Sequence, residues 1–163
     1  METKIIPYEL YCCASIQKFG NLMFGGWSFI LLHDSKIIAE SYGSEIGSQP
    51  RMELLAIING IEEAQKFKQK KDEIRVYTNS GYVMNCYTKE WYKTWLKNGW
   101  KTSTDESVVN YDLWIKLIPY FDRLDYNFSR VVPLGDITLD DKAKRYAKRA
   151  AKKLKENWKG YGQ

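Results

Sequence analysis

Histidine is nearly absent and cysteine is scarce: the 163 residues include one histidine, His33, and three cysteines, Cys12, Cys13 and Cys86. Their spacing matches no zinc site. An odd number of cysteines, in a chain whose first ten residues show no basic flank followed by an apolar stretch, favours reduced thiols over a disulfide framework. No apolar run approaches the roughly 20 residues needed to cross a bilayer. We therefore expect a cytoplasmic or nuclear protein that is neither secreted nor associated with a membrane.

The chain also lacks internal repeats, low-complexity tracts and linker-like stretches. Hydrophobic residues make up 44% and charged residues 28%, which is typical of a globular rather than a disordered chain. A length of 163 residues suits one domain with a full hydrophobic core. We expect a single domain over residues 1–163, with its core over residues 8–155.

Basic residues are in modest excess, which permits nucleic-acid binding without establishing it. The 25 lysines and arginines exceed the 20 acids, giving a formal charge of +5. The excess is concentrated near the end of the chain, where nine cations stand against one acid, Glu156. This segment is either a solvated terminal helix or a surface that faces a polyanion. The nine are Lys142, Lys144, Arg145, Lys148, Arg149, Lys152, Lys153, Lys155 and Lys159.

The first third of the chain predicts three antiparallel strands. Residues 8–15 alternate and are rich in bulky side chains, and residues 23–33 and 36–43 show similar character. A tight turn at 33–36 joins the second and third, and the connections are too short for crossovers. Residues 16–24 between the first two strands are expected to form an apolar loop. Its residues Phe19, Leu22, Met23 and Phe24 either form an exposed patch for a protein partner or tuck under the domain.

The remaining segments predict helices that alternate with two more strands. Pro50 suits a helix start, and apolar residues recur with a period near 3.6 from Met52 to Ala64. Ser80 is a plausible N-cap, and Asn98–Gly99 predicts a helix stop. The order of elements implies an α/β fold with a five-stranded mixed sheet, three antiparallel strands followed by two parallel ones. The expected strands are 73–78 and 125–132, and the expected later helices are 80–87, 89–97, 107–121 and 140–157.

Four short motifs, in order, resemble those of type 1 ribonuclease H, in the bacterial form with a basic handle helix. They are RMELLA at 51–56, YTNSGYV at 77–83, KNGWKT at 97–102 and NYDLW at 110–114. The resemblance covers roughly residues 8–155 and implies the ribonuclease H-like fold. It also implies cleavage of the RNA strand of RNA–DNA hybrids with two magnesium ions, held by four carboxylates.

Only one of those four carboxylates is recognisable. Glu53 matches the helix glutamate, whereas Cys13 falls on the first-strand aspartate, with Cys12 there if the alignment slips by one residue. Asn79 takes the place of the third acid and Lys144 that of the fourth. The family's mobile histidine is also missing, with Leu134 near its position. No catalytic set is intact.

The substitutions change the charge of the expected pocket from −4 to 0, if the cysteine stays protonated. That change removes the field that concentrates two dications, and a lysine ammonium would occupy or repel a metal position. We therefore expect no cofactor, with magnesium bound at Glu53 and Asn79 only if activity is retained. The alternative is a local register shift that lets Asp140 or Asp141 substitute for a lost carboxylate.

The basic handle region, residues 89–101, retains side chains suited to nucleic-acid contact, because lysines neutralise phosphates and aromatic rings pack against sugars or bases. Its tryptophans could equally anchor it to the domain body. Gln49 stands where the family reads RNA hydroxyls. The expected nucleic-acid-binding residues are Lys89, Lys93, Trp95, Lys97, Lys101, Gln49 and Lys144.

Three hypotheses follow. The first is a catalytically inactive ribonuclease H-like protein that binds RNA–DNA hybrid or double-stranded RNA without cleaving it. The second is a protein-interaction scaffold that uses the ribonuclease H fold, with residues 16–24 as the partner surface. The third is an active magnesium-dependent hybrid ribonuclease with a rebuilt metal site.

Overall fold

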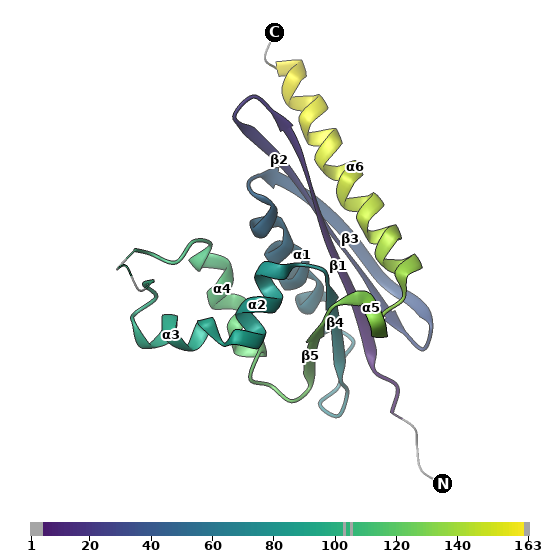
Figure 1. The fold of residues 1–163 in the computed structure, drawn as a ribbon. Coiled ribbons are helices and arrows are strands. Elements are labelled where there is room, and N and C mark those ends of the chain that lie inside the picture. The colour runs from purple at the N-terminus through teal and green to yellow at the C-terminus, as the bar shows by residue number, and fades with distance from the viewer. Residues whose placement is uncertain (1–4, 103, 105, 162–163) are drawn as a thin grey trace.

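A single five-stranded sheet with strand order β3-β2-β1-β4-β5 organises the molecule (Figure 1). The computed structural model describes residues 5–102, 104 and 106–161. β1 (Tyr8–Phe19), β2 (Leu22–His33) and β3 (Lys36–Ile46) form an antiparallel meander. β4 (Ile74–Thr78) and β5 (Tyr126–Ser129) add in parallel to β1 and to each other. The predicted mixed sheet is confirmed.

The first hairpin is longer than predicted. Residues 16–24 do not form a loop, because β1 and β2 continue pairing until Phe19 meets Leu22 across a turn at Gly20, whose φ of 59° favours glycine. Phe24 is fully buried, whereas Phe19 is 50% and Met23 36% exposed. The apolar set therefore divides between core and surface.

Helices cover the two faces of the sheet. α1 (Gln49–Ala64) packs on one face of β1 and β2, and α6 (Ile137–Tyr161) packs on the other face. Alternation along β1 separates the two cores: Leu10 and Cys12 join the α1 side, and Tyr11 and Cys13 join the α6 side. Cys13, rather than Cys12, therefore faces the last helix.

Local signals explain where several helices begin and end. Ser48 and Ser80 each cap a helix by accepting a hydrogen bond from the backbone N–H three residues later, at α1 and at α2 (Gly81–Lys89). α3 (Trp91–Lys97) ends before Gly99, whose φ is 64°. The helix expected over 107–121 is shorter, because Asn110 has a left-handed φ of 62° and α4 (Tyr111–Leu117) begins after it. A 3-10 turn, η1 (Ile118–Tyr120), follows at Pro119.

The last helix is longer than expected and is preceded by one short turn. β5 is shorter than the strand expected over 125–132, because α5 (Val131–Leu134) begins after Arg130. α6 runs for 25 residues to Tyr161. The α2–α3–α4 segment projects away from α6, on the other side of the sheet (Figure 1). Within the described residues, no helix is long and apolar enough to cross a membrane.

Candidate functional site

The residues at the four expected acid positions converge on one cavity. It holds about 120 Å³ and is lined by side chains from β1, α1, the end of β4 and α6. These elements meet there because β4 lies parallel to β1, so that the end of β4 opens beside the middle of β1. The lining residues are Cys12, Cys13, Ala14, Gln49, Glu53, Thr78, Asn79, Ser80 and Lys144.

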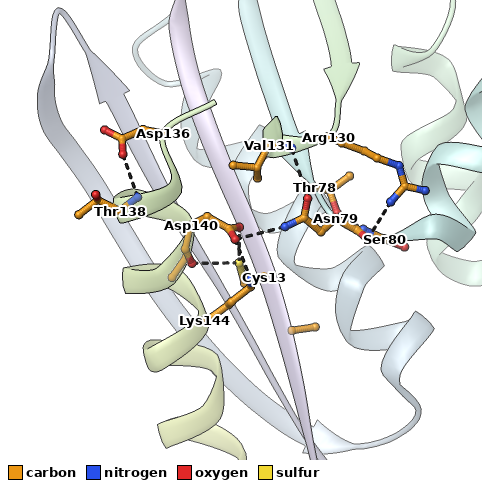
Figure 2. Close-up of polar contacts among 12 residues, drawn as sticks. Cys13, Thr78, Asn79, Ser80, Arg130, Val131, Asp136, Thr138, Asp140 and Lys144 are labelled. Atoms are coloured by element: carbon orange, nitrogen blue, oxygen red, sulfur yellow. Dashed lines mark hydrogen bonds and ion pairs between the residues drawn. The ribbon is translucent and has the colours of Figure 1, made fainter. Parts of the chain in front are cut away.

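Asp140 contacts three of these residues, Cys13, Asn79 and Lys144 (Figure 2). Its side chain is buried, with 3% of the residue exposed. One carboxylate oxygen lies 3.2 Å from the Cys13 thiol, and the other lies 3.2 Å from the Asn79 amide nitrogen and 2.9 Å from the Lys144 ammonium. The structure thus places both Lys144 and Asp140 at the site, one helical turn apart on the same face of α6. Asp141 is exposed.

The contacts to Asp140 fix the protonation of its neighbours. Burial, followed by the charge of Asp140, raises the pKa of the Cys13 thiol, so that this sulfur stays protonated and donates to the carboxylate. The hydrogen bond with Asp140 raises the pKa of Lys144, which keeps the ammonium charged. Lys144 is nevertheless 54% exposed, so one side of it faces solvent.

Glu53 is the second carboxylate at the cavity. Burial raises its pKa, and a hydrogen bond from the Ser80 hydroxyl partly opposes that shift. Counting two carboxylates and one ammonium, the site carries a formal charge of −1 rather than the expected 0. The difference is Asp140, which a linear alignment with Lys144 leaves out.

The donor set does not fit a pair of magnesium ions. Both carboxylate oxygens of Asp140 already accept hydrogen bonds or an ion pair, and the Cys13 sulfur is protonated. The Asn79 amide oxygen accepts a hydrogen bond from the Val131 N–H at 3.3 Å, so Asn79 is not an open ligand. Across the described ranges, no group of three or more histidine, cysteine or acidic side chains could hold a metal. Glu53 alone remains as a charged oxygen ligand, which is too little for two dications.

The predicted binding residues lie in two places. Gln49 lines the cavity and donates to the Ala14 carbonyl at 3.4 Å, and Lys144 lies beside it. The handle region carries the others on α3 and its flanks, where Lys93 pairs with Glu90 and Lys89 lies 5.7 Å from the Trp91 ring. Lys97 and Lys101 are exposed.

The tryptophans of the handle region mainly anchor it. Trp95 is half-buried, and its ring packs against Trp100 and, edge to face at 5.4 Å, against the fully buried Trp114. Trp91 is 36% exposed. Trp95 therefore holds α3 against α4, and Trp91 is the ring that faces solvent.

Arg51, near the start of α1, links that helix to the start of α4. Its guanidinium forms ion pairs with Glu45 and Asp112, both at 2.9 Å, and donates to Asn110. The Arg51 contact lowers the pKa of Asp112. Because Arg51 lies two residues before Glu53 on α1, this pairing fixes the start of α4 relative to the site.

Arg130 is a candidate that the sequence interpretation missed. It follows β5, is exposed, and donates to the Asn79 carbonyl at 3.4 Å, so its charge lies at the rim of the site (Figure 2). In the sequence it is only a single arginine near the end of the strand expected over 125–132, with no motif around it. The parallel pairing of β5 with β4 brings it beside Asn79.

Comparisons with known proteins agree on one family. The RNase H family model matches residues 7–132. The chain is 35% identical over 152 residues to the ribonuclease H of Syntrophomonas wolfei, covering 93% of this chain and 98% of that protein. It is 36% identical over 112 residues to the ribonuclease H of Oleidesulfovibrio alaskensis, covering 69% and 70%.

Solved structures share the fold at lower identity. A foamy viral protease-reverse transcriptase in complex with an RNA/DNA hybrid superposes with a TM-score of 0.75 at 16% identity, over 93% of this chain and 21% of that one. A type 1 RNase H with the type 2 active-site motif gives a TM-score of 0.68 at 19% identity, over 93% and 74%.

Proposed function

Because the chain belongs to the ribonuclease H family, we propose that it is a member that binds RNA–DNA hybrid or double-stranded RNA without cleaving it. The observation that carries this proposal is the Asp140 network. At three positions where the resemblance to the family places an acid, this chain carries a thiol, an amide and an ammonium. All three groups contact one buried carboxylate, that of Asp140. The ammonium of Lys144, paired with Asp140, lies at the position where the resemblance to the family places a metal-binding carboxylate.

The same arrangement supports binding. Lys144 keeps an exposed side beside the cavity, and Arg130 adds a second exposed cation at the rim. A backbone phosphate that enters the site would meet charged donors without a metal bridge. The lysines of the handle region, which Trp95 anchors against Trp114 on α4, would contact the same duplex farther along. The named relatives act as ribonuclease H, so loss of cleavage is the part that needs the sharper test.

Two assays with one labelled RNA–DNA hybrid test the proposal. With magnesium or manganese we expect no cleavage, and in a salt series we expect affinity that weakens steeply as salt rises. Cleavage that is abolished by Glu53→Gln would show an active nuclease with a rebuilt site. Repeating the binding assay with double-stranded RNA identifies the preferred duplex.

Variants separate duplex binding from a scaffold role. Replacing Lys89, Lys93, Lys97 and Lys144 with glutamine should weaken hybrid binding at least tenfold at about 0.15 M salt, because each phosphate contact contributes to the salt-dependent term. No salt-dependent affinity for either duplex, together with copurification of a partner through the hairpin that carries Phe19 and Met23, would favour the scaffold.

A further inference from the structure

A second group of cations lies on the outer side of α6, beyond the candidate site. We call it the α6 basic face. All of its members except the half-buried Lys155 are exposed. In the described part of the chain none of them forms an ion pair, whereas Lys142 and Lys144 pair with Glu40 and Asp140. The members are Arg145, Lys148, Arg149, Lys152, Lys153 and Lys155.

The spacing of these cations does not stabilise helix α6. Arg145 and Arg149, like Lys148 and Lys152, stand four residues apart, and like charges at that spacing destabilise a helix. The helix is held instead by small buried residues on its other side, including Ala143, Ala147 and Ala151, which pack on the sheet. A partner with repeated negative charge would relieve the repulsion.

The packing of α6 discriminates between kinds of anionic partner. A basic amphipathic helix binds a membrane by burying its apolar side in the lipid. Here that side is occupied by β1 and β2, which leaves only charge for a partner. From Arg145 to Lys155 the helix advances about 15 Å at 1.5 Å per residue. A nucleic-acid strand carries one phosphate per roughly 3.4 Å of its axis, so several phosphates fit along that length.

We propose that the α6 basic face is a second nucleic-acid contact, which holds phosphate backbone lying beyond the cavity. It begins next to Lys144 and continues along α6, on the opposite side of the sheet from the handle region (Figure 1). A nucleic acid can therefore reach it by continuing past the cavity, away from α3. The ligand class rests on the proposed function, but the surface and its residues do not overlap with the cavity or the handle region.

The test compares four versions of the full chain on one long RNA–DNA hybrid across a salt series. The first is unchanged. The second has Arg145, Lys148, Arg149 and Lys152 replaced with glutamine. The third has the substitutions at Lys89, Lys93, Lys97 and Lys144. The fourth is a control that loses the same charge at four exposed lysines elsewhere, Lys36, Lys70, Lys71 and Lys116.

The α6 variant should bind at least tenfold more weakly at about 0.15 M salt, and its slope of log affinity against log salt should fall by about 2 to 4. The control should change affinity less than threefold. Thermal unfolding checks the fold, and the α6 variant should unfold no earlier than the unchanged chain, because it loses repulsion.

The outcomes distinguish the two proposals. If the α6 variant binds like the control, the α6 basic face is not a nucleic-acid contact, whatever the third version does. If the α6 variant loses affinity and the third version does not, this inference stands and the cavity-centred proposal fails. Phosphatidylserine vesicles provide the last arm: binding to them through the α6 cations, with no binding to the hybrid, would overturn the inference in favour of an anionic surface.

Discussion

The Nζ atom of Lys144 lies 2.9 Å from Oδ2 of Asp140, which is four residues earlier on α6 and only 3% exposed. A buried carboxylate requires compensation, and here it receives an ammonium, an amide N–H and a thiol. The cation that balances the site is thus part of the chain.

The effects of removing Lys144 and of neutralising Asp140 should not be additive. Lys144→Met leaves the Asp140 charge buried with one donor fewer, and should lower the free energy of unfolding by about 1–2 kcal/mol. This is less than for a fully buried pair, because Lys144 is half exposed. Asp140→Asn in the Lys144→Met background should cost less than Asp140→Asn alone. Urea unfolding of the double-mutant cycle measures this, and simple additivity of the two changes would contradict it.

Glu53 should reduce stability at neutral pH. Its pKa is raised by burial, so the native state holds the proton more tightly than the unfolded state. Stability is therefore greatest below the unfolded pKa of about 4.3 and declines as pH rises through the folded pKa. Glu53→Gln should stabilise the chain at pH 7 by a few tenths to about 1 kcal/mol. Its advantage should vanish near pH 4, and an advantage independent of pH would show that the carboxylate charge is not the cause.

Placing acids at the three positions that contact Asp140 should create a metal site. The variant with Cys13→Asp, Asn79→Asp and Lys144→Asp would gather five carboxylates with Glu53 and Asp140. Their repulsion should lower the melting temperature without divalent ions. Magnesium at about 100 times its Kd should then raise it by roughly 5–10 °C, since that occupancy is worth about 2.7 kcal/mol. The unchanged chain, measured at equal ionic strength, should show no magnesium shift, and a comparable shift there would mean that its own donors bind the ion.

The fold was predictable because its signals are local and ordered. Alternation along β1, Pro50 near the start of α1, the Ser80 cap and Gly99 each mark an element where the structure has one. The longer hairpin was not, because residues near its end contact α6: the Phe24 ring lies 6.0 Å from the ring of Trp158. That contact joins residues more than a hundred positions apart, and the pattern of residues 16–24 does not contain it.

The sequence predicts which residues lie near one another at the site, but not the contacts between them. Cys13, Glu53, Asn79 and Lys144 do line one cavity. The sequence left a choice between Lys144 and Asp140, since residues four apart on a helix share a face. The structure shows that both reach the site, and that the Asp140 carboxylate contacts Cys13 and Asn79 as well as Lys144. Arg130 was missed because only the pairing of β4 with β5 brings it there.

Gly26 should set the position of α6 and, with it, that of Asp140. A Cβ atom at Gly26 would overlap the Ala147 carbonyl and approach the Ala151 nitrogen, both backbone atoms of α6 that no side-chain movement can withdraw. Gly26→Ala should therefore push α6 away from β2 and destabilise the chain by about 1–3 kcal/mol. The matched control is Gly81→Ala, where the nearest atom, on Arg130, lies 3.6 Å away and the residue begins α2, so the change should be neutral or stabilising. Urea unfolding compares the two variants. If the two variants have the same free energy of unfolding, α6 can move away from Gly26 without loss of stability. The close packing of α6 on β2 would then not be what positions Asp140.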